Sequence, residues 1–165
     1  MNNRQLYAAY GSNLNIDQMK RRCPESFVVG LGVIEGYELE FRYFANIIKS
    51  QGHQVPVVIW SISDKCLRAL DHYEGVANGL YYKETLKVKL EGVGGENGHG
   101  SEIDAMVYIM NATVNRPIQP PSLSYYEIVR QGYLQNGLEI RSLAVAAIKA
   151  GAKFDEDQII SLGYE

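Results

Sequence analysis

Between Phe27 and Met110 the chain consists largely of short runs with the residue composition of β-strands. The runs cover residues 27–34, 37–43, 45–48, 55–62, 81–90 and 103–110. Several follow one another directly, without the long crossover connection that parallel neighbours need, so antiparallel pairing is favoured. Gly30 and Gly32 interrupt the first run and predict a bulge, or a bend where the sheet curls toward a barrel. The sequence therefore predicts an α+β fold built around a curled, largely antiparallel sheet.

Helices are expected on either side of this strand-rich region and within it. The first begins after Asn15 and stops at Cys23-Pro24, because proline cannot continue a helix. The others are expected from Ser63 or Asp64 to near Gly75, from Ser122 or Ser124 to about Asn136, and around residues 143–151. Serine caps the first turn of a helix and glycine readily ends one. Residues 92–101 are expected to form a mobile hairpin loop, residues 111–122 an irregular connection, and the tail 154–165 one more helical turn.

Length and charge narrow the range of functions. The chain has 165 residues, which suits a single domain, residues 1–165, with a core of its own. The formal net charge of -3 gives no reason to expect nucleic acid or an anionic membrane as partner. No apolar run approaches the length of a membrane span, and the first residues lack the apolar centre of a signal peptide.

Two cysteines, Cys23 and Cys66, lie far apart in the sequence and form no Cys-x-x-Cys motif. We expect them to be reduced and mostly buried, in a cytoplasmic protein. The three histidines show no His-x-x-x-His spacing, so neither a metal site nor a cofactor is expected.

The segment Tyr7-Ala8-Ala9-Tyr10-Gly11-Ser12-Asn13-Leu14 is expected to form a strand, a tight loop and the entry to a helix. Gly11 would allow a sharp turn and a close approach to a ligand. Asn15 would cap the helix, with Gln18 completing a capping box. Such a loop can hold a carboxylate or phosphate on unpaired N–H groups, although an ordinary strand-to-helix turn explains the same residues.

A second candidate is Glu74, which follows the apolar positions of the helix that ends near Gly75. The end of a helix presents partial negative charge, so a carboxylate is electrostatically unfavourable there. A solvated end residue is one interpretation of this glutamate. A buried Glu74 would instead have a raised pKa and could transfer protons near neutral pH.

Three motifs together resemble the gamma-glutamylcyclotransferase family, also called AIG2-like. They are Tyr7-x-Ala9-Tyr10-Gly11-Ser12-Asn13-Leu14, then Leu70-Asp71-x-x-Glu74-Gly75-Val76-x-x-Gly79-x-Tyr81, then Pro121-Ser122-x-x-Tyr125. Their order and separations also fit, so the resemblance covers roughly residues 7–138. Ala8 replaces an aromatic residue often found in relatives. The resemblance implies a small mixed, mostly antiparallel β-barrel with flanking helices.

The resemblance also implies an activity: attack of the alpha-amine of a gamma-glutamyl compound on its own side-chain carbonyl, releasing 5-oxoproline and an amine or amino acid. It implies that Glu74 is the catalytic acid/base and that no metal or organic cofactor takes part. The implied substrate-binding residues are Tyr7, Ala8, Ala9, Tyr10, Gly11, Ser12, Asn13, Leu14, Tyr81 and Tyr125. The expected partner is a small gamma-glutamyl substrate, and the protein is expected to be a monomer or homodimer.

Two other functions fit the same residues. One is a binding module that uses this pocket for a small carboxylate ligand without catalysis. The other is a structural or interaction domain in which the loop, the acid and the tyrosines are unrelated. The presence of Glu74 favours the enzyme, because a binding module has no need of a group that carries protons.

Overall fold

The structure is a computed structural model, and it describes residues 3–94, 100–111 and 116–153. Five strands form a barrel in the order β1-β3-β2-β4-β5. They are β1 (Arg4–Ala9), β2 (Phe27–Arg42), β3 (Phe44–Ser63), β4 (Tyr81–Gly94) and β5 (Gly100–Met110). All neighbours are antiparallel except β1 and β5, which meet in parallel through a single pair, Tyr7 and Met106. The predicted mixed, mostly antiparallel barrel is confirmed, and its closure at β1–β5 is loose.

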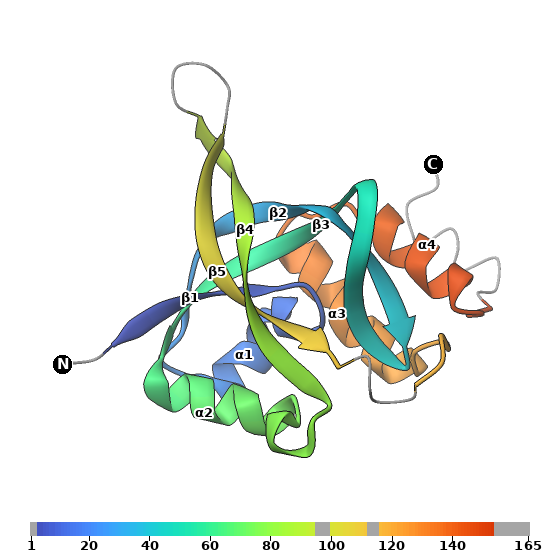
Figure 1. Cartoon of the computed structure of the whole chain (residues 1–165), viewed down its shortest axis with the longest axis horizontal. Coiled ribbons are helices and arrows are strands. Elements are labelled where there is room, and N and C mark those ends of the chain that lie inside the picture. Colours follow the sequence, from blue (N-terminus) through green and yellow to red (C-terminus); the bar gives the residue numbers. More distant parts are fainter. Residues whose placement is uncertain (1–2, 95–99, 112–115, 154–165) are drawn as a thin grey trace.

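Strands β2 and β3 are longer than the runs that the sequence predicts, because each joins two of those runs through a bend. Their pairing shifts register between Val28 and Gly30, and again between Glu35 and Tyr37. At the second shift Gly36 and Gly52 have positive φ, a conformation that glycine adopts without steric cost. Figure 1 shows both strands changing direction, so that residues 37–49 lean away from the barrel wall.

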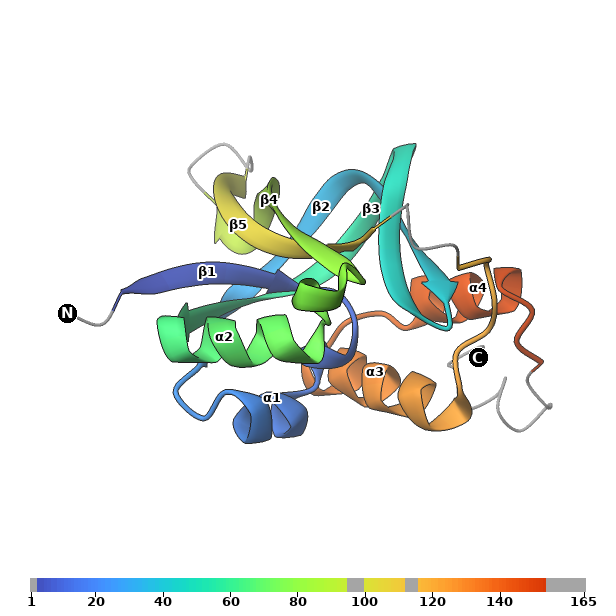
Figure 2. The ribbon, with the colours of Figure 1, turned by 60° about the horizontal axis from the view of Figure 1, so that its bottom comes forward.

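In the described part of the chain, four α-helices pack outside the barrel: α1 (Ile16–Arg22), α2 (Asp64–Tyr73), α3 (Leu123–Gln135) and α4 (Arg141–Lys149). Short 3-10 helices, η1 (Ser12–Leu14) and η2 (Val76–Asn78), lead into α1 and follow α2. Figure 2 shows α1, α2 and α3 along one side of the barrel. The N-caps chosen from the sequence are confirmed for three helices, where Asn15, Ser63 and Ser122 accept hydrogen bonds from the first turn.

Buried apolar side chains of the described residues form one cluster, which fills the barrel and continues under α3 and α4. Gly132 of α3 allows this helix to pack very close to a neighbouring segment. A Cβ atom at this position would lie 2.7 Å from the Asn15 amide nitrogen and 2.7 Å from the Leu14 Cβ. Glycine therefore allows α3 to lie directly on the loop that enters α1. Residues 95–99 of the predicted loop 92–101 and the whole of the predicted tail 154–165 lie outside the described residues.

The cysteines differ from the expectation. Cys23 and Cys66 are buried as predicted, but a disulfide joins them, so the prediction that they are reduced is wrong. Cys23 is the C-cap of α1 and Cys66 lies in the first turn of α2, and these helices pack side by side. The pairing depends on this tertiary contact, which sequence spacing does not reveal. The expected cytoplasmic location rested partly on reduced cysteines, and that support is lost.

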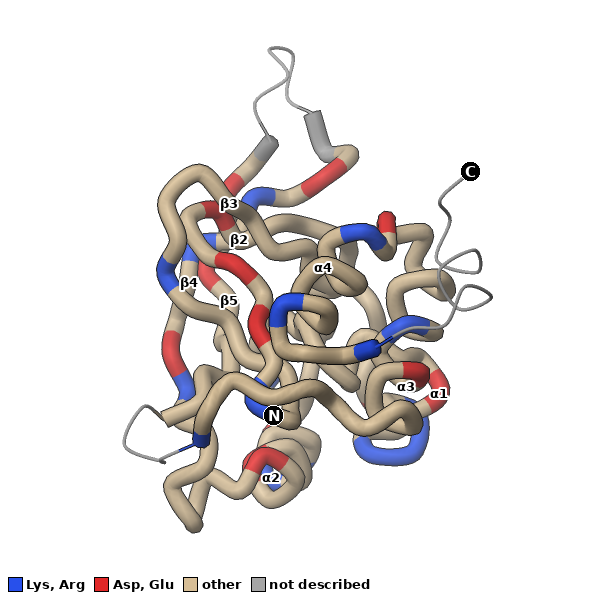
Figure 3. Tube along the Cα trace, turned by 90° about the vertical axis from the view of Figure 1, so that its right-hand side faces the viewer, with Lys and Arg blue, Asp and Glu red and all other residues tan. Residues whose placement is uncertain are grey.

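Charged residues of both signs are interspersed along the chain, and the view in Figure 3 shows no face of one sign. The longest basic stretch ends α1, where Lys20, Arg21 and Arg22 are consecutive. Among the described residues, no helix has the length and apolar character needed to cross a membrane.

Candidate active site

The loop after β1 is held in place from three directions. The indole Nε1 of Trp60 on β3 donates to the Asn13 carbonyl oxygen at 2.9 Å. The side chain of Asn15 caps α1 and also donates to the Ile128 carbonyl of α3 at 3.0 Å. Asn136, just after α3, donates to the Leu14 carbonyl at 2.9 Å. These bonds fix η1 between the barrel and α3, so the loop is a rigid part of the fold.

Gly11 lies where the chain turns out of β1. Its φ of -113° and ψ of -132° fall in neither the β nor the right-handed α region, which agrees with the prediction that glycine allows an unusual backbone conformation here. A Cβ atom here would lie 3.2 Å from the Ala45 Cβ and 3.4 Å from the Tyr125 hydroxyl. Gly11 therefore serves a close approach between the loop, β3 and α3. The predicted capping box is half right, because Asn15 caps the helix while the Gln18 side chain turns to Asn13.

Glu74 lies at the C-terminus of α2, where the local sequence fixes its backbone. Its N–H still donates to Leu70 within the last helical turn. Gly75 follows in the left-handed conformation at φ 62°, which ends the helix and starts η2. The chain thus turns away immediately after Glu74, and the carboxylate stays beside the loop that follows β1.

The carboxylate of Glu74 lies next to the side chain of Asn13, a residue of the loop after β1. Asn13 Nδ2 lies 3.5 Å from Glu74 Oε1 and donates to the Tyr7 hydroxyl at 3.0 Å. Burial raises the pKa of Glu74 to about 7, and the nearby positive charge of Arg22 opposes that rise. A carboxyl group with this pKa exists in both protonation states near neutral pH, as a group that first takes and then returns a proton requires.

Hydrogen bonds at its other end fix the orientation of the Asn13 side chain. Asn13 Oδ1 accepts from Arg22 Nη1 at 2.9 Å and from Gln18 Nε2 at 3.3 Å. Because both partners are donors, the oxygen of the amide must face α1 and its NH₂ must face Glu74. Arg22 and Gln18 are one helical turn apart on α1, and Arg22 also stacks 4.3 Å from the ring centre of Tyr73.

A cavity in two parts opens beside Glu74. The inner part holds about 20 Å³ and its lining includes the loop residues Gly11, Ser12 and Asn13. The outer part holds about 230 Å³ and lies between α1, α3 and the ends of α2 and β4. Four residues line both parts: Ser12, Glu74, Tyr81 and Tyr125. Glu74 therefore lies at the boundary between the outer and the inner part of the cavity.

Five tyrosines line the inner part: Tyr7, Tyr10, Tyr81, Tyr108 and Tyr125. Three of them donate their protons to the protein, because the hydroxyls of Tyr10, Tyr81 and Tyr108 bond to Tyr108 O, Ala45 O and Asp71 Oδ1. The hydroxyls of Tyr7 and Tyr125 instead accept N–H bonds, from Asn13 and Ala45. Burial raises the pKa of Tyr125 to about 12, so it remains a protonated phenol at neutral pH.

The structure brings together eight of the eleven residues that the sequence proposed for the site. Tyr7, Tyr10, Gly11, Ser12, Asn13, Glu74, Tyr81 and Tyr125 all line the inner part of the cavity. Ala8, Ala9 and Leu14 lie in the hydrophobic core and line neither part.

Sequence reasoning missed Arg22, Gln18, Ala45 and Tyr108. The spacing of four residues between Gln18 and Arg22, just after the loop, was a usable signal for those two. Ala45 and Tyr108 lie within ordinary strand patterns and gave no signal of a functional role. Among the described residues, no three His, Cys, Asp or Glu side chains gather as a metal site would require.

Residues 7–127 match the family described as gamma-glutamyl cyclotransferase, AIG2-like. The chain belongs to this family. Gamma-glutamylcyclotransferase of Homo sapiens is 30% identical over 147 residues, which cover 82% of this chain and 73% of that protein. The Mus musculus protein of the same name is 30% identical over 145 residues, covering 81% and 72%.

A solved gamma-glutamyl cyclotransferase superimposes with a TM-score of 0.75 at 26% identity, covering 99% of this chain and 100% of that one. Its agreement extends over the barrel and the flanking helices alike. The family, the fold and the enzyme class that the sequence predicts are therefore confirmed. The family match covers residues 7–127, which include every residue that lines the inner part of the cavity.

Proposed function

We propose that this member of the gamma-glutamyl cyclotransferase family cyclises a small gamma-glutamyl compound to 5-oxoproline, with Glu74 as its acid/base. The observation that carries the proposal is the position of Glu74: a carboxyl group with a pKa of about 7, held by Asn13 at the junction of the two parts of the cavity. A group that must accept and then return a proton works best when its pKa is close to the working pH.

The nucleophile of this reaction belongs to the substrate. Glu74 as carboxylate accepts a proton from the alpha-ammonium, and the freed amine attacks the side-chain carbonyl to form the ring C–N bond. Glu74 as acid then protonates the nitrogen of the original amide, whose C–N bond breaks. Over the whole reaction the alpha-ammonium loses two protons and the departing amine gains two. Because the nucleophile is tethered, the enzyme mainly has to hold the reactive conformer.

The loop supplies donors for an anionic oxygen of the substrate. The N–H groups of Leu14 and Asn15 bond back to Gly11 and Ser12. Among the described residues, the Ser12 and Asn13 amides donate no main-chain hydrogen bond outside η1, and both residues line the inner part. Donors that are fixed before the reaction stabilise a negative oxygen without reorganisation. Tyr7, whose hydroxyl accepts from Asn13, keeps its own proton to donate beside them.

The sizes of the two parts of the cavity support an assignment of the two ends of the substrate. The inner part has room for about one water-sized group, so only the head of the glutamyl unit enters it. The departing amine or amino acid lies in the outer part, beside Arg22 and Tyr73. A non-catalytic binding module gains nothing from a titrating carboxyl group at this junction. Cytoplasmic location and a monomeric or homodimeric state stay predictions.

The direct test is release of 5-oxoproline from a panel of gamma-glutamyl compounds with different leaving groups. We expect one class of leaving group to be cyclised at a rate well above the uncatalysed reaction. Binding of 5-oxoproline without turnover of any panel member would favour the binding module instead.

Replacing Arg22 should move the pH profile. Because the Arg22 charge opposes the raised pKa of Glu74, Arg22→Met should raise that pKa further. The base form of Glu74 would then appear at higher pH, so the rising limb of kcat/KM against pH should shift upward from about pH 7. Arg22→Lys keeps the charge and should shift the limb less.

The matched control is Arg21→Met, which removes the same charge from the neighbouring exposed position. Arg21→Met should leave the rising limb of kcat/KM at the same pH as in the wild type. An equal shift in both variants would mean that overall charge, and not the contact with Asn13 and Glu74, controls the profile.

A further inference from the structure

Ala45 of β3 lines the inner part of the cavity next to Gly11, and it has no functional side chain. Its main chain holds two of the cavity tyrosines. The Ala45 carbonyl accepts from the Tyr81 hydroxyl at 2.6 Å, and the Ala45 N–H donates to the Tyr125 hydroxyl at 3.2 Å. Both tyrosines line both parts of the cavity beside Glu74. The position of the Ala45 main chain therefore determines the positions of the Tyr81 and Tyr125 hydroxyl groups.

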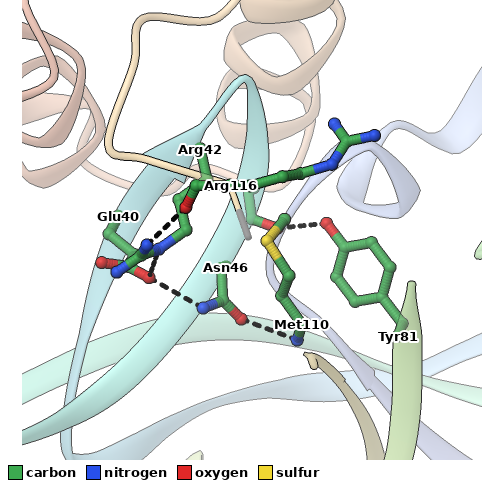
Figure 4. A network of polar contacts seen from close by, with 7 residues as sticks. Glu40, Arg42, Asn46, Tyr81, Met110 and Arg116 are labelled. Carbon is green, nitrogen blue, oxygen red and sulfur yellow. Dashed lines mark hydrogen bonds and ion pairs between the residues drawn. The ribbon is translucent and has the colours of Figure 1, made fainter. Parts of the chain in front are cut away.

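Behind Ala45 lies a buried polar network that touches neither part of that cavity. Asn46, 4% exposed, donates through Nδ2 to Glu40 Oε1 at 2.8 Å and accepts through Oδ1 from the Met110 N–H at 2.9 Å (Figure 4). Successive side chains of a strand point to opposite faces, so Asn46 points away from the cavity. It faces a separate groove of about 610 Å³ between β2–β3 and the ends of β4 and β5.

The network continues from Glu40 to the segment before α3. Glu40, 7% exposed, accepts from Arg42 Nε at 2.7 Å, and Arg42 Nη1 donates to the Arg116 carbonyl at 2.6 Å (Figure 4). The guanidinium of Arg116 in turn lies 5.6 Å from the ring centre of Phe44. Arg42 and Asn46 thus donate to the same oxygen of the Glu40 carboxylate, Oε1, and the charge of Arg42 compensates this buried charge.

Sheet pairing does not fix this part of β3 against the rest of the barrel. In the described sheet, β1 pairs with residues 58–63 of β3, whereas residues 44–49 pair with β2 alone. Across the barrel, the start of β3 is held to β4 and β5 by the bonds from Tyr81 to Ala45 and from Met110 to Asn46. Asn46 therefore supplies one of the two attachments, and Glu40 orients its amide.

We propose that Asn46 and Glu40 are positioning residues for the cyclisation: they hold the Ala45 main chain where it presents the Tyr81 and Tyr125 hydroxyls to the substrate. The inference rests on the proposed function, because it concerns the same cavity. The two residues act through Ala45 and contact no reacting atom.

Exchanging the amide of Asn46 and the carboxyl group of Glu40 tests this proposal. Asn46→Asp replaces the donor to Glu40 with a second carboxylate, so the pair repel and Ala45 shifts. We expect kcat/KM to fall between about 10-fold and 100-fold, mostly through KM, because the tyrosines no longer grip the substrate. The double variant Glu40→Gln/Asn46→Asp again pairs one amide with one carboxylate, and an acceptor for Met110 remains. We expect it to recover to within about threefold of wild type.

Ser61→Ala is the control for lost stability. Ser61 lies on β3, the strand of Asn46, but at the opposite end of the barrel, and its buried hydroxyl accepts a hydrogen bond from Arg4. Loss of this bond should lower the melting temperature while leaving KM unchanged. If Asn46→Asp does not fold, Asn46→Ala should show the same rise in KM.

Wild-type KM in a folded Asn46 variant would overturn the proposal, and so would a double variant that remains as impaired as the single one. Failure of the wild type to release 5-oxoproline from any panel member would instead refute the proposed function, and the inference would fall with it.

Discussion

Glu74→Gln should abolish most of the release of 5-oxoproline while leaving ligand binding in place. The amide keeps the shape of the carboxyl group but can neither accept the ammonium proton nor return it. General acid–base catalysis by one residue contributes about 10²–10⁴-fold, so kcat should fall by at least that order. The measurement is turnover by wild type and variant, together with thermal-shift titration by 5-oxoproline.

The stability of this variant separates lost chemistry from lost structure. The folded pKa of Glu74, about 7, is above the value of 4.5 for an unperturbed glutamate, so the unfolded chain ionises first. Wild-type stability therefore decreases as the pH rises between these two values, and the Gln variant avoids that loss. At pH 8 it should melt at the same temperature as wild type or higher. Equal turnover in the folded variant would mean that the acid/base lies elsewhere.

Reduction of the Cys23–Cys66 disulfide should lower the free energy of unfolding by about 2–4 kcal/mol, the usual range for a bond that closes a loop of this size. The bond spans 43 residues and joins the end of α1 to the start of α2. Denaturant unfolding of the wild type with and without a reductant measures the loss directly. The double variant Cys23→Ala/Cys66→Ala should unfold at the lower midpoint under both conditions.

Thiol alkylation under denaturing, non-reducing conditions provides the control for this prediction, and it should modify no cysteine of the oxidised protein. Two modified cysteines in protein that was never exposed to reductant would show that the bond does not form.

Local features of the fold could be predicted from the sequence because they depend on neighbouring residues. Asn15, Ser63 and Ser122 begin helices as expected, since capping depends on residues within one turn. Gly30 lies at a register shift of β2, as its position inside a strand predicts, whereas Gly32 is paired without a shift. The loop of residues 11–13 and Glu74 were found as two separate signals, and the resemblance to a family joined them.

Contacts between distant segments could not be predicted in this way. No spacing rule shows that Cys23 reaches Cys66, or that Tyr108 of β5 lines the same cavity as Tyr7 of β1. The sequence pointed to Gly11 through its backbone freedom, but it gave no sign of the close contact between Gly11 and Ala45, 34 positions later in the sequence. Ala45 itself acts through its main-chain N–H and carbonyl groups. The type of side chain at this position gives no information about that role.

The bend in β3 also allows one strand to contact the loop after β1 at two places. One half of this strand reaches the loop after β1 through Trp60, and the other half reaches it through Ala45. The two halves meet at residues 49–54, where the pairing with β2 shifts and Gly52 turns the chain. An angle within one strand thus governs where the loop of residues 11–13 lies relative to Ala45. We expect relatives with a different bend in this strand to hold the loop at a different distance from the start of β3.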